Sequence, residues 1–260
     1  MSMTASAHDD AVPQAIPAPA PVITRVLAHG LYETQNVLRN GEQLLVSLIL
    51  PLLVLFGVHR LELITDGSTP SIDIVTPGVL TLAVMASAFT GQGIATGFER
   101  QYGVLAYLST TPLGPVGLIL GKAVAVLVVV VIQLLVLGGA GLALGWSPEI
   151  SGIAWLALGV VLGAAAFTAL GLLIAGTVRA EATLAVTNVA WVLMGAAGGA
   201  VFPLSLDGIA GLLILLPSAA LGEALRTATL DGAAQVTALI VLAGWAVLAV
   251  LAARRWFTWK

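Results

Sequence analysis

The residue types that usually carry out catalysis or bind metals are scarce and scattered in this sequence. It has no cysteine, and its three histidines, His8, His29 and His59, are isolated, whereas a metal site would need at least a pair of them at ligand spacing. No HExxH, GxSxG or Gly-rich dinucleotide motif is present. The segment around Gly121-Lys122 lacks the first glycine and the final Ser or Thr of a phosphate-binding loop. We therefore expect no catalytic residue, no metal site and no cofactor-binding residue in this chain.

The polar side chains in the middle of the long apolar segments are amides and hydroxyls. Gln92, Gln133 and Asn188 lie there, where they could form hydrogen bonds between helices or line a mildly polar pathway. An ion-coupled transporter usually keeps an Asp, Glu or Arg on its pathway, and an intramembrane protease needs a buried catalytic pair or cluster. Neither pattern is visible, which favours a transporter that receives its energy from a partner. A self-sufficient secondary transporter, or another polytopic membrane protein, is the alternative.

The composition places the chain in a membrane. Of its 260 residues, 59% are hydrophobic and only 9% are charged, and the mean hydropathy is +1.05. Soluble domains have about a quarter of their residues charged, so a soluble fold could not cover this much apolar surface. The net charge of −3 gives no indication of nucleic-acid binding.

The apolar segments predict an all-α membrane protein with about six spans, each near the ~20 residues that cross a bilayer. A Pro-rich tail, 1–22, is expected to be disordered and cytoplasmic. The permease domain, 23–260, is expected to begin with an amphipathic helix at 23–43 in the membrane interface. The predicted spans are 44–64, 78–98, 116–144, 153–178, 182–202 and 236–253. The segment 209–216 is too short to span and is expected to be re-entrant or interfacial.

The basic residues predict that both chain ends are cytoplasmic. Cytoplasmic loops carry an excess of Lys and Arg. With the N-terminus inside, eight of the ten basic residues are cytoplasmic: Arg25, Arg39, Arg100, Lys122, Arg179, Arg254, Arg255 and Lys260. Only Arg60 and Arg226 then lie outside, and an even number of spans returns the C-terminus to the cytoplasm. Glu223 and Arg226, one helical turn apart, are expected to form a local surface pair.

The cytoplasmic loop between the second and third predicted spans is the segment most indicative of function. A short helix is expected there, with Val104, Leu105 and Leu108 exposed beside Glu99 and Arg100. Thr and Pro residues then end it before the third span. An exposed apolar tip of this kind is typical of a docking element for another protein. The alternative for the two charged residues is an interfacial pair that ends the second span.

This loop resembles that of the permease subunits of type-2 ABC exporters, including the daunorubicin-resistance type. The family pattern is Glu-Arg-Glu-x-Gly-Thr-Leu-Glu-x-Leu, then Thr-Pro, then Gly-Lys. The residues that match it are Glu99, Arg100, Gly103, Leu105, Leu108, Thr111, Pro112, Gly121 and Lys122. The chain differs from the pattern at Gln101, Val104 and Ala106. The length, the number of predicted spans, the N-terminal helix as an elbow helix and the outer re-entrant segment also resemble those of the family.

The resemblance implies a transport subunit of a bacterial inner (cytoplasmic) membrane exporter with no catalysis of its own. Two permease chains, identical or different, would form the substrate pathway, and ATP and Mg would bind to separate ABC ATPase subunits. The loop 97–115 would be the coupling helix: Glu99 and Arg100 would make polar contacts to the ATPase, Gly103 would allow a tight turn, and Leu105 and Leu108 would fill an apolar groove. The apolar spans suit a hydrophobic or amphipathic substrate, as in multidrug or lipid efflux, with membrane lipid around them.

Overall fold

The computed structural model describes residues 20–61, 71–196, 198–201 and 208–258. Within these ranges all regular secondary structure is helical and no strand occurs, so the predicted all-α class is confirmed. The elements are α1 (Val22–Arg39), α2 (Gly41–Leu44), the π-helical η1 (Leu45–Ile49), α3 (Leu50–Leu61), α4 (Ser71–Met85), the π-helical η2 (Ala86–Gly91), α5 (Gln92–Gln101), α6 (Val104–Ser109), α7 (Gly114–Ala143), the 3₁₀ turn η3 (Ile150–Gly152), α8 (Ile153–Thr177), α9 (Ala180–Ala196), the 3₁₀ helix η4 (Gly208–Leu215), α10 (Pro217–Leu230) and α11 (Val236–Trp256).

Four helices in the described part of the chain are long and apolar enough to cross a membrane. They are Ser71–Gln101, Val116–Ala143, Ile150–Thr177 and Val236–Trp256. Two shorter apolar helices, Ser47–Arg60 and Ala180–Ala196, fall at the first and fifth predicted spans. The chain is therefore a multi-pass membrane protein, and the count of six crossings stays a prediction.

The predicted second and fifth spans have different ends in the structure. The second begins at Ser71, well before the predicted start at 78, and the carboxylate of Asp73 in its first turn accepts a hydrogen bond from the backbone N–H of Ser147 at 2.9 Å. The fifth was predicted to reach 202, but its helix ends at Ala196, and 198–201 form a bend. The positive φ of Gly199, 71°, belongs to this bend. An apolar run shows which residues are buried but not where the helix ends: Ala200 and Val201 are buried although the helix has already ended.

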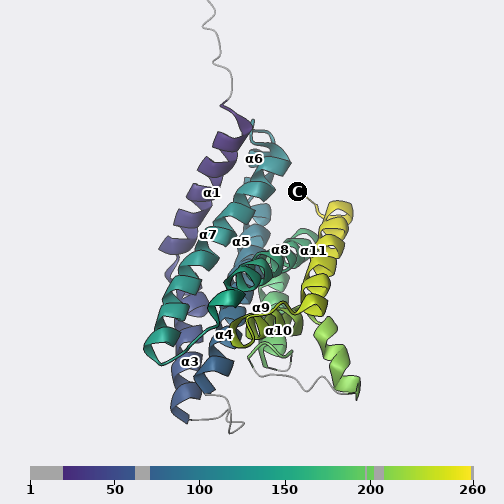
Figure 1. Cartoon of the computed structure of the whole chain (residues 1–260). Helices are drawn as coiled ribbons and strands as arrows, with labels where there is room; N and C mark the ends of the chain where they lie inside the picture. Colours follow the sequence, from purple (N-terminus) through teal and green to yellow (C-terminus); the bar gives the residue numbers. More distant parts are fainter. Residues whose placement is uncertain (1–19, 62–70, 197, 202–207, 259–260) are drawn as a thin grey trace, which may run out of the picture.

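Helix α1 lies side by side with α7 (Figure 1). Its buried face consists of Val26, Gly30, Glu33, Thr34 and Val37, so this face mixes apolar and polar side chains. The leucines of α1, Leu27, Leu31 and Leu38, point away from the bundle and are exposed. This helix was predicted at 23–43, and its placement in the membrane interface stays a prediction.

Helix α10 is an almost completely buried element that the apolar pattern did not predict. It packs against α4, α8 and α11. Its Arg226 is 3% exposed and donates to the carbonyl oxygens of Ala200 at 3.1 Å and Gly199 at 2.8 Å. Glu223 lies 3.0 Å from the same guanidinium. Glu223 and Arg226 therefore pair as predicted, but the predicted surface location is wrong: Arg226 is buried and joins the bend after α9 to α10.

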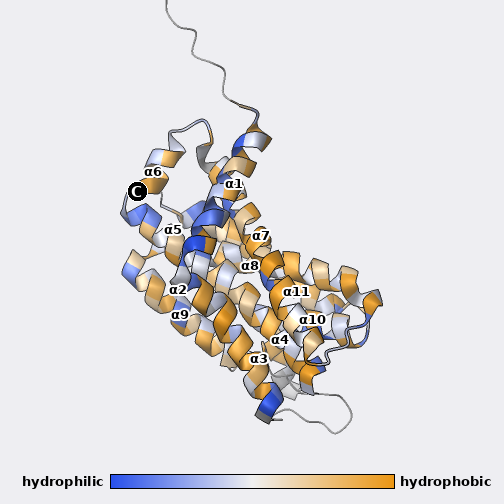
Figure 2. Cartoon of the chain, turned by 90° about the vertical axis from the view of Figure 1, so that its left-hand side faces the viewer, coloured by the Kyte–Doolittle hydropathy of each residue, from blue (hydrophilic) through white to orange (hydrophobic). Residues whose placement is uncertain are grey.

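The distribution of hydropathy separates two regions of the molecule. Hydrophobic residues cover much of the outside of the helices, and hydrophilic residues gather at the end where α1, α5 and the C-terminus meet, next to α6 (Figure 2). We call this region the α6 end. It contains the residues of the predicted docking loop, 97–115.

Candidate functional site

The candidate site begins with a tight turn between α5 and α6. Helix α5 ends at Gln101, and Gly103 has a φ of 75°, in the left-handed region that residues with a Cβ adopt at a cost of about 1–2 kcal/mol. Its backbone N–H donates to the carbonyl of Arg100 at 3.0 Å. An added Cβ would meet nothing within 4 Å, so the backbone conformation alone explains the glycine. The turn sets the six-residue helix α6 at the end of the bundle.

The exposed face of α6 differs from the predicted one. Leu105 is fully buried and Leu108 is half-buried, so the prediction of an exposed Leu105 is wrong. The side chains that face outward are Tyr102, Tyr107 and Val104, with 74%, 72% and 41% exposure. Leu105 turns inward because α6 packs on both α5 and α7 and needs an apolar residue at that contact. Its role is to hold α6 in place.

Hydroxyl groups terminate α6. Ser109, Thr110 and Thr111 donate from their side chains to the carbonyls of Ala106, Tyr107 and Leu108, at 2.7, 2.8 and 2.6 Å. These bonds satisfy carbonyls that the end of a helix leaves free. Pro112 follows and is exposed, and Thr111 is half-buried. The Thr–Pro pair therefore ends the short helix before α7 begins.

A buried ionic cluster lies beneath α6 and joins three helices. The ammonium group of Lys122, from α7, is completely buried. It donates to a carboxylate oxygen of Glu33, from α1, at 3.0 Å and to one of Glu99, from α5, at 2.9 Å. A buried charge is tolerated only when it is paired and hydrogen-bonded, and Lys122 meets both conditions. Glu99 therefore has a partner inside its own chain, and its role in docking stays a prediction.

A close helix crossing brings this cluster together. A Cβ added to Gly121 would overlap the imidazole of His29, so α1 and α7 approach closely only because this residue is glycine. The His29 Nε2 lies 3.4 Å from Glu33. Burial lowers the pKa of His29 below its ordinary value of 6.5; Glu33 opposes this shift and Lys122 adds to it. The imidazole is therefore neutral at neutral pH.

Arg100 connects α5 to two other segments at the same end. Its guanidinium donates to the hydroxyl of Thr258 at 3.0 Å and to the backbone carbonyl of Val178. The hydroxyl of Thr258 in turn donates to the carbonyl of Gly176 at 2.8 Å. Arg100 thus ties the start of the coupling segment to the end of α8 and to the C-terminal segment. Contact with an ATPase also stays a prediction for this residue.

The three amides singled out in the sequence have different surroundings. Gln133 is buried and donates to the carbonyl of Ser47 at 2.9 Å and to the hydroxyl of Ser87 at 2.7 Å. Ser47 and Ser87 belong to η1 and η2, so Gln133 links both π-helical segments to α7. Gln92 is 2% exposed, and its side-chain carbonyl oxygen has no hydrogen-bond partner in the part of the chain that the structure describes. Asn188 is half-buried.

The sequence did not indicate Glu33, Ser47 or Thr258 as parts of these networks. The available signal was the acidic Glu33 four residues after His29, on the same face of its helix. Among the described residues, no group of three or more His, Asp or Glu side chains could hold a metal ion. The main feature of the site is the short helix α6, which packs on α5 and α7 at one end of the bundle.

The comparison with protein families agrees with this description of a multi-pass helical protein with a short, exposed helix at one end. The model of the ABC-2 family transporter protein matches residues 14–255. The chain therefore belongs to the ABC-2 transporter family, and it is a membrane permease of the type-2 ABC class, a transport component that is not itself catalytic. No curated protein matches the chain. Family membership implies an ABC ATPase as partner, and such permeases typically act as dimers.

Proposed function

We propose that this chain is the permease subunit of an ATP-driven exporter and that it couples to a separate ATPase through residues 97–115. Two permease chains, two copies of this one or this one with a sister chain, form the pathway between them. ATP and Mg bind to the ATPase subunits. The loop motif resembles that of exporters that include the daunorubicin-resistance type, and this subtype is part of the proposal.

The observation that carries the proposal is the aromatic tip of α6. Tyr102, Val104 and Tyr107 are exposed at the α6 end, and the ring of Tyr102 stacks on that of Phe98, with 6.1 Å between centroids. Aromatic side chains are enriched among the residues that contribute most to protein interfaces. On the inner side of the same helix, Leu105 is completely buried and holds α6 against the bundle. The apolar groove of the ATPase would therefore receive the tyrosines and Val104, and Leu105 would position them.

The ionic cluster supplies the mechanical link from the tip to the bundle. Glu99 is four residues before Gly103, and Lys122 is in the first turns of α7, so the cluster holds the two helices that flank α6. Glu33 adds α1 to the same unit. A push on α6 by the closing ATPases would thus move α1, α5 and α7 together. This arrangement would convert ATP-driven closure into a tilt of the permease.

The proposed topology has six crossings with both ends in the cytoplasm of a bacterial inner membrane. The helices at Ser47–Arg60 and Ala180–Ala196 would complete the set by crossing beside the four longer ones. The basic residues support this orientation, because eight of the ten fall in segments that it places in the cytoplasm. The apolar helices support a hydrophobic or amphipathic substrate, such as a drug or a lipid.

Copurification tests the coupling proposal. The tagged permease is extracted from its native membrane in mild detergent, and the amount of ATPase recovered per permease is measured. The change Tyr107→Asp should reduce the recovered ATPase by about tenfold or more, because a charge replaces an aromatic contact. Because Tyr107 is exposed, the change should not affect folding, and size-exclusion chromatography of the variant checks this.

Ile150→Asp is the matched control. Ile150 is 81% exposed and follows the far end of α7, at the opposite end of the bundle from α6. This variant should retain the ATPase. Equal recovery with Tyr107→Asp and Ile150→Asp would overturn the assignment of α6 as the docking element. If the wild-type permease brings down no ATPase, the proposal that the chain is a subunit of an ATP-driven exporter is overturned as a whole.

A further inference from the structure

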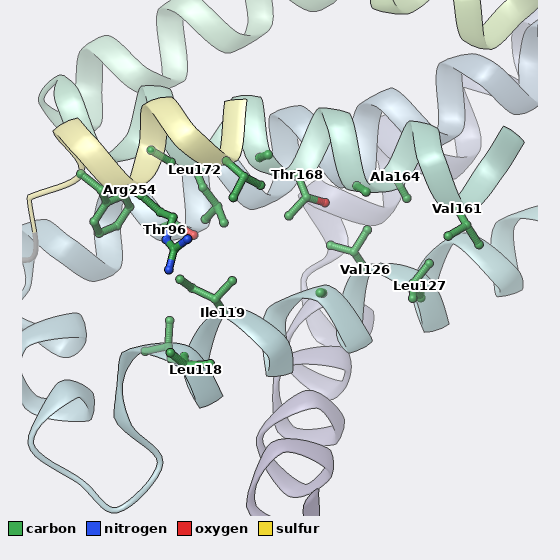
Figure 3. Close-up of a pocket in the computed structure, with 17 residues that line it drawn as sticks. Thr96, Leu118, Ile119, Val126, Leu127, Val161, Ala164, Thr168, Leu172 and Arg254 are labelled. Atoms are coloured by element: carbon green, nitrogen blue, oxygen red, sulfur yellow. The ribbon is translucent and has the colours of Figure 1, made fainter. Parts of the chain in front are cut away.

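A cavity of about 490 Å³ lies between α5, α7, α8 and α11. Figure 3 shows its lining, which is apolar except at a few positions. Leu118, Ile119 and Val126 line it from α7, and Ala164 and Leu172 line it from α8. Pockets for small molecules commonly have volumes of about 300–1,000 Å³. The cavity is therefore large enough for a specific ligand.

The cavity is long enough for one fatty acyl chain. Its lining runs along α8 from Val161 to Leu172, which at the rise of an α-helix is about 16 Å. The hydrocarbon of one bilayer leaflet is half of a core of about 30 Å, or about 15 Å. The lining on α7, from Val116 to Leu127, covers a similar length. Two apolar helix faces of this length suit an extended hydrocarbon chain.

Two buried hydroxyl groups in the cavity have no hydrogen-bond partner among the described residues. They belong to Thr96 and Thr168, which are 1% and 7% exposed. Other buried threonines, such as Thr76 and Thr187, satisfy their hydroxyls by donating to the carbonyl four residues earlier. Leaving a buried polar group unpaired costs free energy. Hydroxyls that line an apolar cavity without a partner indicate a ligand that carries hydrogen-bond acceptors.

One end of the cavity carries a positive charge. Arg254 lines it there, near Thr96, whereas Val161 and Leu127 lie toward the other end (Figure 3). No ion pair of Arg254 occurs among the described residues, and the carboxylates of Glu33 and Glu99 at this end are paired with Lys122. Basic groups beside membrane helices attract anionic lipid headgroups. The charge and the apolar lining together match an amphiphile with an anionic head.

We propose that this cavity binds one anionic phospholipid as a resident ligand of the permease. The phosphate pairs with Arg254, the ester carbonyls accept hydrogen bonds from Thr96 and Thr168, and one acyl chain lies between α7 and α8. Helix α11 packs chiefly on α8, so the lipid fills the space between α7 and α11. Since α7 follows α6 directly, the lipid stabilises the part of the bundle next to the docking helix. This lipid is a structural ligand and is distinct from the exported substrate.

Thermal stability in the presence of added lipid tests the proposal on the purified full-length permease, without an ATPase. Phosphatidylglycerol is titrated into the detergent solution, and the rise in unfolding temperature gives the apparent affinity. Phosphatidylcholine, which has no net charge, is the lipid control. Wild type should bind phosphatidylglycerol more tightly than phosphatidylcholine. Arg254→Gln should weaken the affinity of the permease for phosphatidylglycerol by about five- to tenfold, because one cation contributes about this much to the binding of an anionic lipid.

Arg255→Gln is the matched protein control. Arg255 is also exposed and follows Arg254 in α11, but it does not line the cavity. It should keep the wild-type affinity. Ala165→Phe adds volume at a lining residue that is open to the cavity and should reduce binding of the acyl chain without changing charge.

Three results would overturn the proposal. Equal stabilisation by the two lipids would show that no anionic headgroup is recognised. Equal losses of phosphatidylglycerol affinity in Arg254→Gln and Arg255→Gln would show that the lipid responds to the charge of the surface in general and not to the cavity. Release of bound phosphatidylglycerol during ATP-driven turnover in the assembled complex would identify the lipid as cargo. Because the lipid titration uses the permease alone, its outcome is independent of whether the coupling proposal holds.

Discussion

Replacing Lys122 by methionine should be among the most damaging single changes at the α6 end. Methionine keeps most of the side-chain length and removes the charge. In the structure the ammonium group is completely buried between Glu33 and Glu99, at 3.0 and 2.8 Å from their carboxylates. Without it, two acidic groups face each other in a site with little access to water. The packing should change little, so the effect reports on electrostatics.

The magnitude follows from the burial of the cluster. Removing one partner from a buried ion pair costs about 3–5 kcal/mol, because the remaining charge loses its compensation. For a domain of this size each kcal/mol shifts the unfolding temperature by about 2–4 °C, so Lys122→Met should lower it by about 6–20 °C. Helix α1 should loosen first, since it is joined to α5 at this point through the lysine.

The assay is the loss of monodisperse protein on size-exclusion chromatography after heating the detergent-purified permease in steps. Hydrogen exchange over α1 gives the local readout and should increase in the variant. Arg39→Met is the matched control: it also replaces a cation by methionine, but Arg39 is exposed at the end of α1. Its unfolding temperature should change little, because surface charges contribute little.

A compensated variant separates the ionic explanation from a packing defect. Changing Lys122 to Met together with Glu33→Gln and Glu99→Gln removes all three charges, and replacing a complete buried ion cluster is often neutral or stabilising. This triple variant should recover most of the lost stability. The reasoning is refuted if Lys122→Met unfolds within about 2 °C of wild type, less than about 1 kcal/mol, or if the triple variant is as unstable as the single one.

Four further changes test other parts of the structure by the same heating assay. Leu105→Ala should cost about 2–5 kcal/mol, because Leu105 is fully buried; no loss would mean that α6 is not packed on the bundle. Gly103→Ala should cost about 1–2 kcal/mol through its positive φ alone, and an unchanged unfolding temperature would contradict the left-handed turn. Arg226→Met should cost about 3–5 kcal/mol, since two carbonyls and Glu223 lose their donor. A loss below about 1 kcal/mol, which is typical of exposed ion pairs, would mean that Arg226 lies at the surface. Burial lowers the pKa of His29 in the folded protein, so the unfolded chain binds the proton more readily. The contribution of His29 to the free energy of unfolding should therefore be constant above pH 6.5 and fall as the pH drops from 6.5 toward the lowered pKa. Glu33 and Lys122 face this imidazole, and His29→Gln should flatten that fall; an unaltered pH profile would exclude His29 as its source.

Local features of the sequence predicted much of the fold. The apolar segments at 116–144, 153–178 and 236–253 coincide with α7, α8 and α11 to within a few residues. Lipid requires long runs of apolar residues in helices, so composition alone reveals them. The short helix α6 was also expected, because Gly103 and the Thr–Pro pair bound it.

The buried face of each short element was harder to predict. Leu105 and Arg226 were both expected at the surface, and both are buried. At about 100° per residue, Val104, Leu105 and Leu108 lie on one side of α6. This pattern shows that the helix has an apolar side, but it does not show whether that side packs on the bundle or faces a partner. In α10 the arginine is buried because three carbonyl and carboxylate groups surround it, and two of these belong to a distant bend.

By itself, the sequence determined that this protein is helical, that it lies in a membrane and that its loop at 97–115 resembles a docking segment. Each of these follows from residues that are neighbours in the chain. Only the tertiary structure decided which tyrosines face outward and which charges are paired. Lys122 meets Glu99 and Glu33 across separations of 23 and 89 residues. Such pairs form where helices cross, and the crossing point depends on how side chains fit around Gly121, which no local pattern encodes.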